Sequence, residues 1–183
     1  MSKIEIPFKY NKKYYKTIEK DYEKTAENVS KVRWSFVGGL NPKTVLDYGA
    51  GACFMSKYAP KGVVVDTFDI GDFPIKYTGI RHKYYDLVFL FDVLEHIPDF
   101  RVLDGIFKKA KHVCISLPIL PKGRKLKGWK HFKYDTGEHL HYFTKGSLDL
   151  FFEARGFERI KSGFPECPPR SDIWSVVYKR YNK

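Results

Sequence analysis

The chain contains few of the residues that mark disulfide-linked, zinc-binding or membrane-spanning proteins. Its 183 residues include three cysteines, Cys53, Cys114 and Cys167, which lie far apart and never in C-x-x-C spacing. This number and spacing argue against both a disulfide framework and a zinc site. No apolar run approaches the ~20 residues of a membrane span, and the amino-terminal segment has no apolar core typical of a leader peptide. We therefore expect a cytoplasmic protein without a membrane span.

Acidic residues are also scarce, since 21 Asp and Glu residues face 33 Lys and Arg residues and the formal net charge is +12. The stretch from Pro121 to Tyr134 contains no acid, and it combines Trp129, Phe132 and Tyr134 with a run of cations. A basic segment with interleaved aromatic rings can hold phosphates and stack on bases or sugars, whereas many lysine-rich loops are simply solvated. RNA or an anionic glycan is therefore a partner that this loop allows. The cations are Lys122, Arg124, Lys125, Lys127, Lys130 and Lys133.

One core is expected for the whole chain. A hydrophobic content of 43% suffices for a buried interior, and no internal repeat or low-complexity tract divides the sequence. We predict a single domain over residues 1–183, with an N-terminal helical cap at about 8–38 and a basic aromatic lid loop at about 118–143.

Strands and helices alternate after the first helix, which the apolar spacing predicts over 14–36. This alternation predicts an α/β fold with a mostly parallel, twisted sheet, helices on both faces and an antiparallel strand near the C-terminus. The predicted strands are 44–47, 63–68, 86–91, 112–117, 158–163 and 173–178, and the further helices are 54–58, 99–111 and one capped by Thr144.

The segment YDLVFLFDVLEHIP, residues 85–98, is the most informative part of the chain. An apolar strand starts near Asp86 and ends on three titratable residues, Asp92, Glu95 and His96. In an open α/β sheet, ligands bind at the carboxyl ends of the strands. The segment therefore predicts one edge of an active site.

A glycine motif, VLDYGAGACF, follows the first predicted strand. Gly49 and Gly51 permit a sharp turn and close approach of the backbone to a ligand. The motif departs from the dinucleotide fingerprint G-x-G-x-x-G, because Phe54 occupies the place of the third glycine. Eighteen residues beyond Gly51, Asp69 ends the second strand and is placed to accept both hydroxyls of a ribose, with Asp66 as the second choice.

Taken together, these residues resemble the class I S-adenosylmethionine-dependent methyltransferases, and within them the type 11 and type 23 methyltransferase domains. The resemblance covers most of the chain after Lys43. It rests on VLDYGAGA, on TFDI with Asp69, on YDLVFLFDVLEHIPD and on EHLHYFTKGSLDLFFEARGFE; Cys53 replaces the last glycine of the family motif.

The resemblance implies S-adenosylmethionine as the methyl donor and S-adenosylhomocysteine as the product. Gly49, Gly51 and their backbone would hold the methionine part, and Asp47 would favour its ammonium group. The cofactor-binding residues implied in this way are Asp47, Gly49, Ala50, Gly51, Asp69, Ile70, Asp72, Phe91 and Asp92.

The family pattern is abbreviated around the third strand, because only sixteen residues separate Asp69 from Asp86. This spacing is too short for the usual helix, strand and loop. The adenine contact that the family makes after that strand is therefore in question. Asp72 is our candidate for it, although a turn residue in IGDFP is an equally good reading.

Methyl transfer to oxygen or nitrogen can require a base with a pKa near neutrality. His96 is the best placed candidate, followed by His139 and His141, and we include Glu95 in the catalytic set. The spacing D-x-x-E-H also resembles the metal sets of quinone-ring O-methyltransferases and small-RNA 2′-O-methyltransferases. An alternative is therefore a divalent metal on Asp92, Glu95 and His96, with His139 or His141 available from the lid loop, and a further one is that these carboxylates only accept backbone amides.

The expected function is methyl transfer to an oxygen or nitrogen of a small molecule or glycan. RNA methylation, including metal-assisted 2′-O methylation, is one alternative, and a non-catalytic module that binds nucleic acid or protein is another. At its helix start, Cys53 is either a reactive thiol or a small packing residue. Neither the acceptor nor the oligomeric state follows from the sequence.

Overall fold

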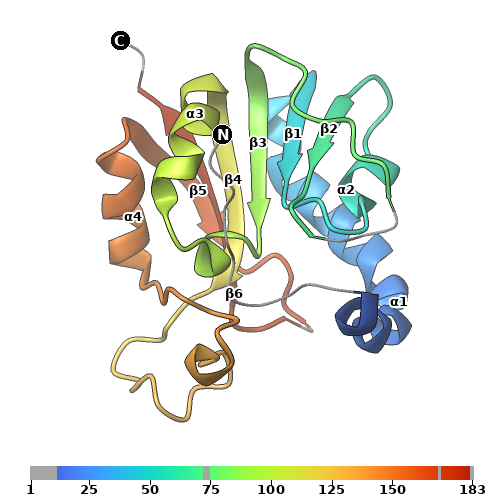
Figure 1. The fold of residues 1–183 in the computed structure, drawn as a ribbon. Coiled ribbons are helices and arrows are strands. Elements are labelled where there is room, and N and C mark those ends of the chain that lie inside the picture. Colours follow the sequence, from blue (N-terminus) through green and yellow to red (C-terminus); the bar gives the residue numbers. More distant parts are fainter. Residues whose placement is uncertain (1–11, 72–74, 169, 182–183) are drawn as a thin grey trace.

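The computed structural model describes residues 12–71, 75–168 and 170–181, with side chains from Thr25 onward. Six strands form one sheet in the order β2-β1-β3-β4-β6-β5 (Figure 1). The first four of these are parallel, and β6 runs antiparallel to both of its neighbours, β4 and β5, which confirms the predicted mostly parallel sheet with an antiparallel strand near the C-terminus. The strands are β1 (Thr44–Tyr48), β2 (Val64–Phe68), β3 (Tyr85–Phe91), β4 (Ala110–Pro118), β5 (Phe157–Gly163) and β6 (Ile173–Arg180).

Helices cover both faces of the sheet. On one face, Ile106 and Phe107 of α3 and Leu148 and Phe152 of α4 pack in a large core cluster. On the other face, α1 and α2 cover alternate residues of the same strands, as expected for strands buried on both sides. The helices are α1 (Lys12–Val37), α2 (Phe54–Lys57), α3 (Asp104–Lys109) and α4 (Lys145–Glu153), with single 3-10 turns at Gly38–Leu40, Leu94–His96, Phe100–Leu103 and Tyr134–Thr136.

The buried stripe of α1 differs from the apolar pattern of the sequence. Ala26, Trp34 and Val37 are buried, but Ser30 and the charged Arg33 are buried with them, and the apolar residues Val29, Val32 and Phe36, whose three- and four-residue spacing predicts the helix, are only half-buried. A prediction of buried positions from apolar residues alone leaves out Arg33, because the acids that pair with it, Asp92 and Glu166, lie far away in the sequence.

The predicted helix over 99–111 is shorter than expected. Asp99 caps a 3-10 turn by accepting the amide of Arg101 at 3.0 Å, and the α-helix begins only at Asp104. It ends at Lys109, because Ala110 is extended and pairs with Tyr85 as the first residue of β4.

The segment between β2 and β3 contains no helix or strand among its described residues, so the abbreviation expected from the sequence is present. This segment runs along the free edge of β2. The amide of Gly79 donates to the Thr67 carbonyl at 3.0 Å, and the Thr78 hydroxyl accepts the Thr67 amide at 2.8 Å. The buried carboxylate of Asp66 anchors the end of the segment. No helix in the described ranges is both long and apolar enough to cross a bilayer.

Candidate functional site

The glycine loop after β1 is held by Asp69. One carboxylate oxygen of Asp69 accepts the Gly51 amide at 2.7 Å, and the other accepts the Gly71 amide at 2.6 Å. The hydroxyl of Tyr77 donates to the Gly51 carbonyl at 2.9 Å and closes the loop from a third side. Since each carboxylate oxygen has two lone pairs, Asp69 retains acceptor capacity for a further donor.

Gly49 is required by its neighbour as well as by its backbone. Its φ is +87°, a conformation that L side chains rarely adopt, and a Cβ atom there would collide with Cγ2 of Val93. The loop after β1 and the loop after β3 therefore touch at this point. The amides of Gly49 and Ala50 both donate to the Phe68 carbonyl, at 2.8 and 3.1 Å.

Asp47, the last residue but one of β1, has a buried carboxyl group. Burial raises its pKa to about 7; the nearby Asp69 adds to the rise and Arg33 opposes it. A group with this pKa is half ionised near neutrality, so its charge responds to any cation brought next to it.

Of two other residues predicted to bind the cofactor, the structure describes one and not the other. Ile70 is exposed beside Asp69, whereas Asp72 lies outside the described residues. Cys53 has a φ of +59° before a four-residue helix, and burial raises the pKa of its thiol to about 11. The structure thus argues against the reactive thiolate and favours the packing role.

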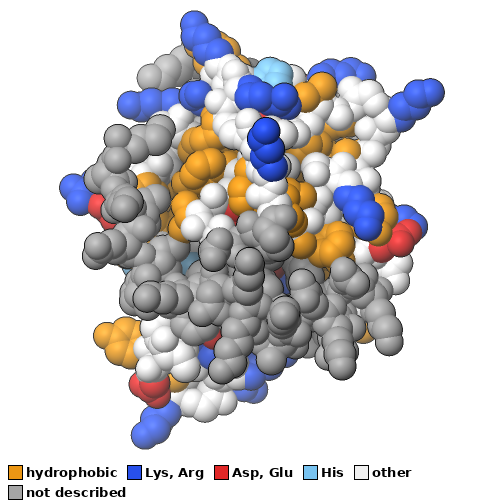
Figure 2. All heavy atoms as spheres, turned by 45° about the vertical axis from the view of Figure 1, so that its right-hand side comes forward, with side chains coloured by type: hydrophobic (Ala, Val, Ile, Leu, Met, Phe, Trp, Pro, Cys, Tyr) orange, Lys and Arg blue, Asp and Glu red, His pale blue; other side chains and the backbone are white. Residues whose placement is uncertain are grey.

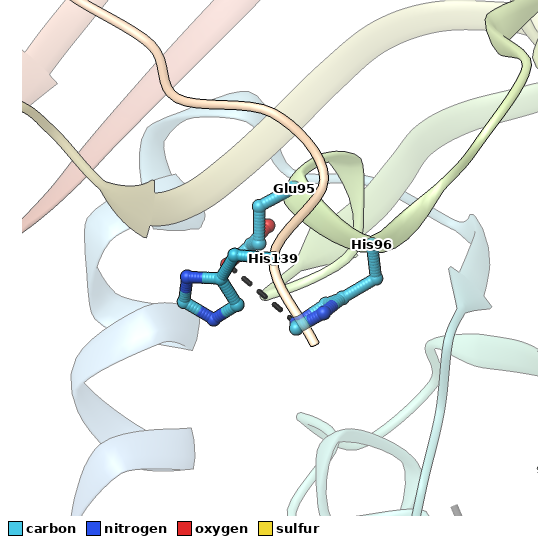
Figure 3. A group of neighbouring side chains, drawn as sticks. All are labelled: Glu95, His96 and His139. Carbon is cyan, nitrogen blue, oxygen red and sulfur yellow. Dashed lines mark ion pairs between the residues drawn. The ribbon is translucent and has the colours of Figure 1, made fainter. Parts of the chain in front are cut away.

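A second cluster lies after β3. Figure 3 shows Glu95 and His96 on one short turn, with His139 brought to them by the segment that crosses in front. One ligand-capable atom from each of these side chains lies within 4.8 Å of the others. The segment is fixed to the turn because the Glu95 carbonyl accepts the amides of Leu140 and His141, at 2.7 and 3.2 Å.

Backbone carbonyls orient both imidazole rings. Nδ1 of His96 lies 2.6 Å from the Glu138 carbonyl, and Nδ1 of His139 lies 2.9 Å from the carbonyl of His131. A carbonyl can only accept, so each Nδ1 carries the proton and each Nε2 of the neutral ring carries a lone pair. Burial lowers the pKa of both histidines, that of His139 to about 4. Both rings are therefore neutral at pH 7.

Glu95 is 2% exposed, and its Oε2 has no hydrogen-bond partner among the residues that the structure describes. Its Oε1 lies 3.9 Å from Nε2 of His96. Burial, together with the nearby Asp92, raises its pKa well above the usual range. A buried polar atom without a partner is uncommon and marks a place where a ligand, an ion or water can bind.

Asp92 belongs to a different group, although it starts the same D-x-x-E-H pattern. It pairs with Arg33 at 3.1 Å and with Arg170 at 2.7 Å. Burial opposes its ionisation, but the two arginines outweigh this effect and hold the pKa of Asp92 below its usual range. Both arginines also pair with the buried Glu166. This four-residue group is called the ion-pair cluster below.

Phe91 lies beneath the ion-pair cluster, with its ring centre 4.2 Å from the Arg33 guanidinium carbon. The His141 backbone bonds Glu95, but its side chain is engaged elsewhere, since its Nε2 bonds the Ile97 carbonyl at 2.9 Å and its ring packs on Phe100. The structure therefore brings together Glu95, His96 and His139, and not His141 or Asp92.

Arg33, Glu166 and Arg170 were not among the residues predicted for the site. The one local indication of this cluster in the sequence is Arg33, a charged residue at a position of the first helix where the spacing predicts a buried side chain.

The lid loop, residues 119–143, is closed at its base by a bridge between Ile119 and Phe143. Its aromatic residues pack on one another: the ring of Tyr142 lies 5.4 Å from that of Phe132 and 6.2 Å from that of Trp129. Lys130 ties the loop to Asp172 at 2.9 Å. The residues from Pro121 to Gly128 are exposed.

A family model described as "Methyltransferase domain" matches residues 19–162, which is most of the chain. The chain belongs to this methyltransferase family. The match confirms the resemblance inferred from the glycine motif and from residues 85–98.

Similar proteins agree on the fold. The structure of the 1,6-didemethyltoxoflavin-N1-methyltransferase of Burkholderia thailandensis has a TM-score of 0.62 to this methyltransferase, at 15% identity, over 98% of this chain and 94% of that one. The magnesium protoporphyrin IX methyltransferase of Synechocystis PCC 6803 has a TM-score of 0.61 at 18% identity, over 90% and 87% of the two chains. These likenesses confirm the predicted Rossmann-like class I fold.

A curated relative, the ubiquinone biosynthesis O-methyltransferase of Nitrosomonas europaea, is 30% identical over an 86-residue alignment. This alignment covers 34% of this methyltransferase and 37% of the relative. The chain thus matches little more than a third of that protein's length.

Proposed function

We propose that this methyltransferase moves the methyl group of S-adenosylmethionine to a hydroxyl oxygen of a small molecule. The proposal rests on two neighbouring features at the carboxyl ends of β1 and β3. One is the glycine loop held by Asp69, and the other is the group of Glu95, His96 and His139. They touch through Gly49 and Val93. A donor site and a proton-accepting site are therefore adjacent.

The cofactor is expected to lie along the glycine loop. Asp69 has lone pairs for ribose hydroxyls, and the exposed Ile70 next to it offers an apolar surface for the adenine ring. The backbone of Gly49, Ala50 and Gly51 would border the methionine part, and Asp47 would attract its ammonium group. Asp92 would border the same space from the end of β3.

The proposed mechanism is alignment followed by proton acceptance. The sulfonium donor is already activated, so holding donor and acceptor in line supplies much of the acceleration. An acceptor hydroxyl must lose its proton as the new C–O bond forms. His96 and His139 are neutral with a lone pair at Nε2, and His96 is the better proton acceptor of the two, because a base with a pKa of about 4, such as His139, holds a proton only weakly at pH 7.

The same residues fit a divalent metal ion. Two imidazoles with carbonyl-bound Nδ1 atoms and a carboxylate with an unpartnered Oε2 are a common donor set. A metal held by Glu95, His96 and His139 would lower the pKa of an acceptor hydroxyl. This set differs from the predicted one in lacking Asp92, which pairs with Arg33 and Arg170; the prediction left both His139 and His141 available as further ligands.

The first test is isothermal titration calorimetry with S-adenosylhomocysteine. We expect binding by the wild-type protein and a loss of about tenfold or more in Asp69→Ala, because a charged hydrogen-bond acceptor is removed. A wild-type protein that releases no heat contradicts the proposal.

The second test is formation of S-adenosylhomocysteine with a panel of phenols and catechols, with and without a chelator. His96→Gln and His139→Gln should lose activity by about 100-fold while binding of the product stays unchanged. His141→Gln should remain active, and an equal loss in that variant would contradict the grouping. Loss of wild-type activity with chelator, restored by added magnesium or manganese, would select the metal.

RNA is the second candidate acceptor, because the exposed cations of the lid loop adjoin the segment that carries His139. A 2′-hydroxyl would then take the place of the small-molecule hydroxyl. Methyl transfer from labelled donor to total RNA, and none to the phenol panel, would favour this candidate.

A further inference from the structure

A basic hollow lies at the amino ends of the parallel strands, the opposite end of the sheet from the proposed reaction site. Its volume is about 380 Å³. In Figure 2, Lys and Arg side chains project from this upper end of the molecule. The residues that line it are Thr44, Tyr84, Tyr85, Asp86, Lys108, Lys109, Ala110, Lys111, Lys179, Arg180 and Tyr181, and we call this group the basic pole.

The basic pole has a strong excess of positive charge. Five cations line it, and Asp86 is the one acid among its described residues. One carboxylate oxygen of Asp86 already accepts the amides of Lys43 and Thr44, at 2.9 and 3.0 Å. These amides stabilise the ionised carboxylate, so Asp86 offsets one of the five positive charges and a net excess of four remains for a ligand to meet.

The cations of the basic pole are not paired with acids. In the part of the chain that the structure describes, no carboxylate forms an ion pair with Lys108, Lys111 or Lys179. Among the described residues, Lys109 donates to the His82 carbonyl, and Arg180 donates to the carbonyls of Ala110 and Phe107 and lies over the Phe157 ring, so neither is paired with an acid there. By contrast, Arg33 and Arg170 each pair with two acids. The charge of the basic pole is thus available to an external anion.

Two tyrosines stand at the rim of the hollow. Tyr84 is 63% exposed and Tyr181 is 44% exposed, and Nζ of Lys83 lies 5.3 Å from the Tyr84 ring centre. Proteins that bind single-stranded nucleic acids combine exposed aromatic rings, on which the bases stack, with lysines and arginines that contact the phosphates. A bilayer surface would instead require a protruding apolar ridge, and no large aliphatic side chain is found among the described residues of this lining.

We propose that the basic pole binds single-stranded nucleic acid, with phosphates on Lys108, Lys111 and Lys179 and bases stacked on Tyr84 and Tyr181. This binding does not depend on the proposed methyl transfer, because the two sites lie at opposite ends of the sheet. It would hold the protein on RNA through a surface other than the lid loop.

The test is fluorescence anisotropy with a labelled 12-nucleotide oligouridine. The triple variant K108Q/K111Q/K179Q should bind about tenfold or more weakly than the wild-type protein and should lower the slope of log affinity against log salt by about 2. Tyr84→Ala should weaken binding about fivefold or more, and Tyr84→Phe should bind like the wild type, because the ring is kept.

The matched control is K122Q/R124Q/K125Q, which removes the same charge from the lid loop. This variant should lose less than about threefold. Equal losses in both triple variants would overturn the proposal, because net charge alone would then explain the binding. Binding to phosphatidylglycerol vesicles that exceeds RNA binding and is lost in the pole variant would also overturn it. Unchanged binding of S-adenosylhomocysteine in the pole variant would show that it is folded.

Discussion

At the scale of single residues, the buried carboxyl group of Asp47 connects a proton with the proposed cofactor. Burial holds its pKa at about 7, so much of it is protonated just below neutrality. An incoming ammonium group favours the ionised form, and binding must therefore release the proton at low pH. Affinity for the cofactor should rise as the pH increases through about 7.

The variant Asp47→Asn tests this connection. We expect it to bind S-adenosylhomocysteine about tenfold or more weakly than the wild type at pH 8, because a charge-assisted contact is lost. Its affinity should also lack the decline that the wild type shows between pH 8 and pH 6. Calorimetry at both pH values measures the two effects, and a decline that persists in the variant would assign the proton to another group.

Asp47 should affect stability in the opposite direction to cofactor affinity: affinity rises with pH, whereas the contribution of Asp47 to stability falls. Because the folded state keeps a proton that the unfolded chain loses between about pH 4 and pH 7, the contribution of Asp47 to stability decreases as the pH rises through this window. Asp47→Asn should flatten that decrease in urea unfolding at pH 5 and pH 8.

Gly49 gives a second prediction for a single residue. Gly49→Ala should lower the free energy of unfolding by about 2–4 kcal/mol, since it adds a side chain at positive φ and a collision with Val93. Gly62 has a nearly equal φ of +84° and open space at its Cβ position, so Gly62→Ala should cost only the backbone strain of about 1–2 kcal/mol. Equal losses in urea unfolding would exclude the Val93 contact, and the double variant with Val93→Ala should recover part of the loss.

At the scale of elements, Asp66 replaces much of what a third strand would do at the sheet edge. Its carboxylate is 0% exposed and accepts the Arg81 amide and guanidinium, His82 Nδ1 and the Tyr85 hydroxyl. Burial opposes its ionisation, but these hydrogen bonds outweigh it and hold the pKa of Asp66 below its usual range. One side chain therefore fastens the irregular segment 75–85 along β2.

Asp66→Ala should destabilise the protein by about 3–5 kcal/mol, because it leaves buried donors without an acceptor. The matched control is Glu27→Ala, which breaks the exposed pair with Lys31 and should cost less than about 1 kcal/mol. The stabilisation by Asp66 is present above about pH 4 and is lost as the pH falls through its lowered pKa. Urea unfolding at pH 7 and at a pH well below 4 measures both effects, and similar losses in the two variants would contradict the anchoring role.

The elements with local signals were predictable. The alternating strands and the Thr144 cap follow from spacing within a few residues, and the structure contains each of them. The end of the helix at Lys109 was not predictable in this way, because the pairing of Ala110 with Tyr85 decides it. The site divides along the same line: choosing His139 over His141 depends on how the lid loop is fixed to the Glu95 carbonyl, which is a long-range contact.

At the scale of the whole molecule, the ion-pair cluster joins three parts of the chain. Arg33 comes from α1, Asp92 from the end of β3, and Glu166 and Arg170 from the connection between β5 and β6. Removing one partner leaves a buried charge with too few counter-charges, which commonly costs 3–5 kcal/mol. The cluster therefore connects the first helix to the last two strands at the carboxyl end of β3.

A double-mutant cycle tests this tie. Arg33→Met and Glu166→Gln should each destabilise the protein by about 3 kcal/mol, and the double variant should lose less than the sum by about 1.5 kcal/mol or more. Urea unfolding provides the three differences. Additive losses would mean that α1 and the β5–β6 connection are stabilised independently.

Arg33 also extends the cluster to the proposed cofactor site, because its positive charge lowers the pKa of Asp47. In Arg33→Met that pKa should rise, and the pH at which affinity for S-adenosylhomocysteine declines should move upward from about 7. Arg180→Met is the matched control, since it removes a similar contact of an arginine with an aromatic ring, that of Phe157, at the other end of the sheet. Calorimetry from pH 6 to pH 9 gives the midpoint for each variant. An unchanged midpoint of the pH dependence in Arg33→Met would show that the ion-pair cluster does not affect the pKa of Asp47. A shift in that variant alone would show that Arg33, from the first helix, sets the pH range over which Asp47 is charged and can attract the methyl donor.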